Sequence, residues 1–70
     1  MAEQNTAFYV EGMINEDSAQ LIKNSLTILN GVIEVIADIN TRRVVVEYDD
    51  ERLNAGIIRE MIEDAGFKVK

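Results

Sequence analysis

TAFYVEGMINEDSAQLIKNSLTIL, residues 6–29, changes its hydrophobic period at Gly12. Before Gly12 the pattern repeats every two residues, with Phe8 and Val10 on one face, and it predicts a half-buried strand over residues 6–11. After it, apolar residues recur at spacings of three and four, which predicts a helix over residues 16–29 that lies on a sheet. This helical stripe comprises Ala19, Ile22, Leu26 and Leu29.

A hairpin follows this strand and helix. Asn30-Gly31 ends the helix, with Gly31 as its left-handed cap. Residues 32–39 and 43–48 each alternate, and the short polar stretch between them predicts an antiparallel hairpin. A four-residue loop is expected to place Val45 opposite Asp38 and Ile36 opposite Glu47. The predicted inward residues are Val35, Ala37, Ile39, Val44, Val46 and Tyr48.

A second helix and a short strand complete the chain. Asn54 is a good N-cap for a helix that runs to Ala65 and stops at Gly66. Leu53, just before the cap, is placed to pack on Ile58 as a hydrophobic staple. Residues 67–70 are predicted to form the last strand. The expected buried stripe of the helix comprises Ile58, Met61, Ile62 and Ala65.

The predicted order is strand, helix, strand, strand, helix, strand, which is the split βαβ pattern of α+β, ferredoxin-like (βαββαβ) folds. Right-handed crossovers put both helices on one face of a four-stranded antiparallel sheet. We expect one domain over residues 1–70, with its core in 6–69. The other face of the sheet is expected to meet water, and it carries mostly charged residues together with the apolar exceptions Tyr9, Ile36 and Val45.

Composition limits the classes of function. Thirteen acidic and seven basic residues give a net charge of −6, which argues against binding to nucleic acid or to an acidic membrane surface. No apolar run approaches the roughly 18 residues of a membrane span, and the first residues lack the pattern of a signal peptide. The expected location is the cytoplasm. The chain has no cysteine and no histidine, which removes disulfides, zinc fingers and redox dithiols.

Four segments resemble the heavy-metal-associated (HMA) domain family in order and separation: FYVEGM (8–13), LNGV (29–32), VVVEYD (44–49) and IEDAGF (62–67). In that family a Gly-Met-x-Cys-x-x-Cys segment binds copper(I), zinc, cadmium or mercury for delivery between chaperones and membrane ATPases. Here Asn15 and Ser18 stand at the two cysteine positions, and Ile14 stands where Thr is usual. The resemblance therefore implies the metal-carrier scaffold without its ligand pair.

The ligand chemistry makes this departure decisive. Soft ions such as copper(I) prefer charged, polarizable sulfur, whereas a carboxamide and a hydroxyl are neutral, hard donors. Met13 is one thioether, and the resemblance implies that it packs under the loop. We therefore expect no metal ligand and no cofactor. Asn15 is instead a good N-cap, with Glu16 and Asp17 favourably placed in the first helical turn.

Two other kinds of site are considered. A hard-cation site could use oxygen donors around the helix start, but adjacent side chains there point in different directions and no calcium-binding loop motif is present. Its residues would be Glu11, Asn15, Glu16, Asp17 and Ser18. The acidic run over residues 49–51 is interpreted as a solvated turn. An enzyme is not expected, since the chain lacks histidine, cysteine and a glycine-rich phosphate loop.

Two functional hypotheses remain. The first is a protein interaction or regulatory module linked to metal transport, whose acidic surface steers it toward a basic protein partner. The second is copper binding or transport through a shared or non-cysteine site. The chain is expected to be a monomer or a weak homodimer, with the second or last strand as the possible edge contact. The contact residues implied for the first hypothesis are Met13, Ile14, Glu16, Asp17, Gln20 and Phe67.

Overall fold

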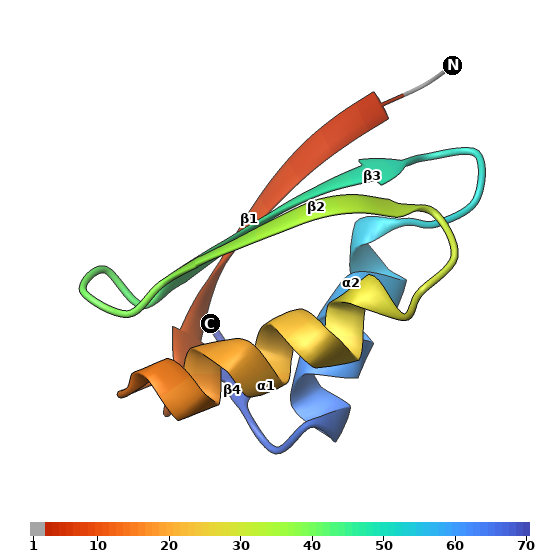
Figure 1. Ribbon diagram of the computed structural model, residues 1–70. Helices are drawn as coiled ribbons and strands as arrows, with labels where there is room; N and C mark the ends of the chain where they lie inside the picture. Colours follow the sequence, from red (N-terminus) through yellow and green to blue (C-terminus); the bar gives the residue numbers. More distant parts are fainter. Residues whose placement is uncertain (1–2) are drawn as a thin grey trace.

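The computed structural model describes residues 3–70, which form six elements in the predicted order (Figure 1). The elements are β1 (Glu3–Glu11), α1 (Glu16–Thr27), β2 (Val32–Asp38), β3 (Arg43–Asp49), α2 (Ala55–Asp64) and β4 (Lys68–Val69).

The four strands form one antiparallel sheet in the order β2-β3-β1-β4, and both helices cover the same face of it (Figure 1). This confirms the predicted ferredoxin-like fold. The expected edge strands are also confirmed, since β2 and β4 are the outer strands. Each outer strand has one unpaired side.

Several element boundaries differ from the prediction. β1 begins at Glu3 rather than residue 6, because its pairing with β3 extends from Tyr9↔Arg43 to Glu3↔Asp49. α1 ends at Thr27 with Ile28 as its C-cap, so Gly31 has a positive φ but lies three residues beyond the cap rather than forming it as predicted. β4 comprises two residues rather than four, because only Val10 and Glu11 pair with it.

The core lies between the helices and the inner face of the sheet. The predicted helical stripes account for most of the helices' share of it, although Leu29, Met61 and Ala65 are only partly buried. Leu53 and Ile58 are both buried in the core, as the predicted staple requires. The buried residues are Val10, Met13, Ala19, Ile22, Leu26, Val35, Val44, Val46, Tyr48, Leu53, Ile58, Ile62 and Val69.

The hairpin register corrects one expectation about the outer face. Ile36 lies opposite Val45, and Asp38 lies opposite Arg43. The loop does have four residues, but a four-residue loop after Asp38 necessarily pairs Asp38 with Arg43, so the expected pairs were displaced by two residues. Ile36 and Val45 are therefore direct cross-strand neighbours on the solvent face.

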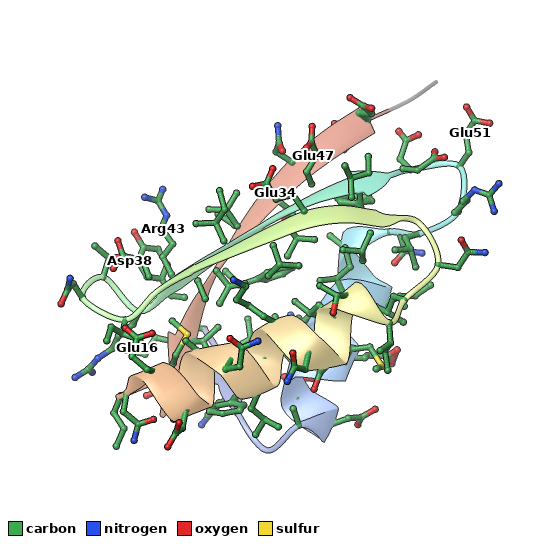
Figure 2. The ribbon with its side chains drawn as sticks, viewed as in Figure 1. Glu16, Glu34, Asp38, Arg43, Glu47 and Glu51 are labelled. Atoms are coloured by element: carbon green, nitrogen blue, oxygen red, sulfur yellow. The ribbon has the colours of Figure 1, made fainter. Side chains whose placement is uncertain are left out.

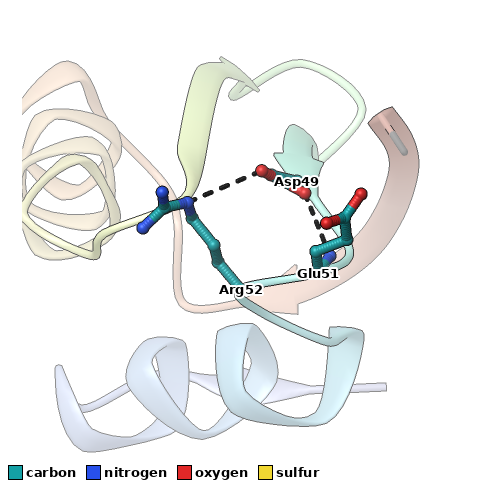
Figure 3. Close-up of polar contacts among 3 residues, drawn as sticks. All are labelled: Asp49, Glu51 and Arg52. Carbon is teal, nitrogen blue, oxygen red and sulfur yellow. Dashed lines mark hydrogen bonds and ion pairs between the residues drawn. The ribbon is translucent and has the colours of Figure 1, made fainter. Parts of the chain in front are cut away.

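The turn between β3 and α2 is organised by Asp49. Its carboxylate accepts a hydrogen bond from the Glu51 backbone N–H at 3.0 Å and lies 3.6 Å from the Arg52 guanidinium (Figure 3). The Asp49 backbone N–H donates to the Gly31 carbonyl oxygen at 2.8 Å. The turn therefore joins the exit of α1 to the end of β3, and the Asp49 carboxylate already has its partners within the turn.

Candidate functional site

The loop between β1 and α1 ends in a closed helix cap. Asn15 is extended (φ −149°), and its Oδ1 accepts hydrogen bonds from the Ser18 backbone N–H at 2.8 Å and the Ser18 hydroxyl at 2.9 Å. The Asn15 carbonyl accepts the first helical bond from Ala19 N–H at 3.1 Å. The two positions at which the resemblance places cysteines thus converge and hydrogen bond to each other.

Two charges reinforce this helix start. Glu16 and Asp17 lie in the first turn of α1, where free backbone N–H groups and the helix dipole favour negative charge. Both side chains are exposed. Figure 2 shows Glu16 at the same end of the molecule as Asp38 and Arg43, which flank the β2–β3 hairpin. The acidic pair is therefore open to solvent at the start of α1.

Met13 corrects the expected contact surface. Its side chain has no solvent exposure and belongs to the core cluster, as a methionine that packs under the loop would. A fully buried side chain cannot touch a docked protein, so the predicted surface loses this residue. The same burial removes the Met13 sulfur from contact with solvent.

The other residues of the expected surface are at least partly accessible. Ile14 is 70% exposed, Glu16, Asp17 and Gln20 are exposed, and Phe67 is half-buried. The Phe67 ring lies against the loop at Gly12, since a Cβ built on Gly12 would be 3.5 Å from that ring. The Gln20 amide donates to Asn24 Oδ1 at 2.9 Å. The fold therefore brings the loop, the start of α1 and the aromatic residue before β4 to one end of the molecule.

The comparisons with known proteins agree with this architecture. The profile of the heavy-metal-associated domain matches residues 7–68. The chain belongs to the heavy-metal-associated domain family. A curated relative, the copper chaperone CopZ of Staphylococcus haemolyticus, is 35% identical over 66 residues, which cover 94% of this chain and 97% of CopZ.

Solved structures of HMA domains superpose closely on the fold. Oxidized MerP from Ralstonia metallidurans has a TM-score of 0.92 at 26% identity, covering 99% of this chain and 96% of MerP. The N-terminal domain of a potential copper-translocating P-type ATPase from Bacillus subtilis, solved in its Cu(I)-loaded state, has a TM-score of 0.90 at 27% identity. That match covers 100% of this chain and 86% of the other.

The donors at the loop do not fit the soft metal cargo of this HMA scaffold. Asn15 offers a neutral amide oxygen and Ser18 a neutral hydroxyl, and each already has the other as a partner. Within residues 3–70, no three His, Cys, Asp or Glu side chains converge as ligands of an ion would. None of the helices formed by residues 3–70 has the length and hydrophobicity of a bilayer-spanning segment.

Substitution of Asn15 should measure how much the helix cap contributes to the free energy of unfolding. We expect Asn15→Ala to lower the free energy of unfolding by about 1 kcal/mol, because the Ser18 N–H and hydroxyl lose their acceptor. Asn15→Asp, which keeps an acceptor oxygen, should stay close to the wild type. Urea denaturation of the three proteins checks this, and an Asn15→Ala midpoint equal to that of the wild type would show that the bond adds nothing.

Proposed function

We propose that this HMA domain is a non-catalytic protein interaction or regulatory module associated with metal-transport systems, and that it acts in the cytoplasm on a partner with a basic surface. The observation that most supports this proposal is the closed helix cap at the loop between β1 and α1. The positions that hold the metal in the family pattern are engaged with each other through the Asn15–Ser18 hydrogen bonds. The HMA fold is retained, but a helix cap stands where the family pattern has its soft-metal ligands.

The surface beside that loop supports a protein as the ligand. It combines an exposed apolar side chain, Ile14, with the carboxylates of Glu16 and Asp17 and the half-buried ring of Phe67. Apolar area excludes water from a contact, while flanking charges select the partner and increase the association rate. Because the chain carries a net charge of −6, long-range attraction favours a basic partner.

Charge reversal at the acidic pair tests this surface. The immobilised chain and its Glu16→Lys plus Asp17→Lys variant are used to capture proteins from an extract of the source cells, and recovered proteins are quantified by mass spectrometry. We expect the charge-reversed chain to lose a specific basic partner, because attraction becomes repulsion at the contact. A purified partner should then show a slower association rate and weaker salt dependence with the variant.

A second charge reversal provides the matched control. Asp50→Lys plus Glu51→Lys makes the same change in net charge on two exposed residues of the turn between β3 and α2, and Figure 2 shows Glu51 at the opposite end of the molecule from Glu16. This control should retain the partner. Equal recovery by wild type and the Glu16/Asp17 variant, or equal loss with both double variants, would remove the proposed surface.

A further inference from the structure

A hollow lies where the end of β1 meets the β2–β3 hairpin loop and β4. Its volume is about 300 Å³, and the residues that line it include Tyr9, Glu11, Thr41, Arg42 and Lys70. The Tyr9 and Glu11 side chains are exposed while the residue between them is buried in the core, so they lie on the sheet face that the helices leave open. A volume at the lower end of the range for ligand pockets suits a small molecule.

Backbone hydrogen bonds hold the three segments of the hollow together. The Val10 N–H donates to the Arg42 carbonyl oxygen at 2.8 Å, which joins the hairpin loop to β1. On the other side of β1, the Lys70 N–H donates to the Tyr9 carbonyl oxygen at 2.9 Å. The walls of the hollow are therefore part of the sheet framework.

Positive charge gathers at this corner of an acidic chain. Four of the seven basic residues lie on these segments, namely Arg42, Arg43, Lys68 and Lys70. The Arg43 guanidinium carbon is 5.8 Å from the centroid of the Tyr9 ring, within the range of a cation–π contact. A chain with a net charge of −6 thus places more than half of its cations around one hollow.

Most of these cations have no internal carboxylate partner. The ion pairs formed within residues 3–70 include neither Arg42, Arg43 nor Lys68. Lys70 Nζ lies 4.0 Å from Glu11 Oε1, and these side chains are 67% and 47% exposed, so solvent weakens their attraction. The positive charges are therefore available to a ligand.

The carboxylate on the hairpin is already engaged. Asp38 lies opposite Arg43 in the sheet register, but its Oδ1 accepts hydrogen bonds from the backbone N–H groups of Asn40 and Thr41, at 2.9 and 3.4 Å. It serves the turn rather than the hollow. Glu11 is the carboxylate that lines the hollow itself, so it should oppose an anion there.

The backbone at Arg42 is unusual for its residue type. Its φ is +58°, and within residues 3–70 it is the one non-glycine residue with a positive φ. Glycine, asparagine and aspartate adopt this conformation most readily in turns. Arginine gives the turn no conformational advantage, and strained residues of this kind often serve a function through their side chains.

We propose that this hollow binds the phosphate group of a small anion, either inorganic phosphate or a phosphate monoester. The lining supplies two cations, Arg42 and Lys70, and two hydroxyl groups, those of Tyr9 and Thr41. Donors from three separate segments suit a tetrahedral oxyanion better than a planar carboxylate, which a single arginine can bind through two parallel bonds.

This phosphate site goes beyond the proposed interaction module and does not depend on it. None of the residues that line the hollow belongs to the partner surface around Ile14, Glu16 and Asp17. Tyr9 is 55% exposed, so its ring could also contact the organic part of a monoester. Failure of either proposal would leave the other in place.

Titration of the ¹⁵N-labelled full chain tests the site. Sodium phosphate and phenyl phosphate are added separately at low ionic strength, with sodium chloride of matched ionic strength as the reference. We expect saturable amide shifts at residues 9–12 and 41–42 with a Kd on the order of 1 mM. Tighter binding of phenyl phosphate would assign the site to a monoester, and equal binding would assign it to inorganic phosphate. No saturation by either probe up to about 20 mM would overturn the proposal.

Variants of the lining identify the residues responsible. Arg42→Asn and Lys70→Gln should each weaken phosphate binding at least about fivefold, because each removes a charged donor. Glu11→Gln should strengthen it about twofold or more, since it removes the opposing carboxylate. Arg59→Gln removes the same positive charge from α2, beyond the other face of the sheet, and should bind phosphate like the wild type.

Stability separates a binding role of Arg42 from a structural one. Arg42→Asn should keep or raise the urea midpoint, because asparagine tolerates the left-handed conformation. A lower midpoint together with unchanged phosphate binding would make Arg42 a structural residue and contradict the proposal. Equal weakening of phosphate binding by Arg42→Asn and Arg59→Gln would also overturn it, because net charge alone would then explain the effect.

Discussion

Replacing Asn15 and Ser18 together with cysteine should convert this HMA domain into a copper(I) binder. The Ser18 hydroxyl already lies 2.9 Å from Asn15 Oδ1, so the two side chains converge on one point at the start of α1. Thiolates at these positions would supply charged, soft donors, and the helix N-terminus lowers the pKa of a nearby thiol. We expect the double variant to take up one copper(I) ion per chain in competition with a chromophoric chelator at micromolar concentration.

Two reference proteins make the result interpretable. The wild type should not compete with the chelator, and Asn15→Ala plus Ser18→Ala, which loses the same cap without adding sulfur, should not compete either. Stoichiometric copper(I) binding by the wild type would contradict the proposed loss of metal binding and would support the hypothesis of a non-cysteine site. Absence of binding by the double cysteine variant would show that the loop no longer permits two-coordinate geometry.

The fold was predictable because its signals are local and agree with one another. Two hydrophobic periods and two asparagine caps indicate the same element order, and the structure confirms each helix start at the residue after its cap. Asn15 and Asn54 both accept a hydrogen bond from the backbone N–H three residues on. Consistency of this kind is what allows a sequence to specify one structure.

The errors concern features that depend on long-range pairing. β1 begins three residues before its predicted start because β3 provides a partner for Glu3 through Asn5. No local pattern in that polar stretch indicates a strand. The resemblance implies Met13 as a contact residue, whereas its side chain has 0% relative exposure and belongs to the core cluster.

Gly31→Ala should be the most destabilising single surface-turn substitution in this protein. Gly31 has φ +110°, a conformation that alanine adopts only with strain, and an added Cβ would lie 2.9 Å from the Arg52 Cβ and 3.2 Å from Leu53 Cγ. Left-handed strain of about 1–2 kcal/mol and crowding of about 1–3 kcal/mol together predict a loss of about 3 kcal/mol. Because small domains have about 5–15 kcal/mol of stability, the thermal midpoint should fall by more than about 10 °C.

Gly66→Ala separates the two causes of this loss. Gly66 has a similar φ of +101°, but nothing lies within 4 Å of the position of an added Cβ. Gly66→Ala should therefore lower the free energy of unfolding only by the left-handed backbone strain, about 1–2 kcal/mol. The difference between the two variants in urea denaturation measures how tightly the Asp49 turn is held against the exit of α1, through the Asp49 N–H bond to the Gly31 carbonyl. Equal losses would mean that Arg52 and Leu53 move aside freely, and that this turn does not lock the end of the helix to the sheet.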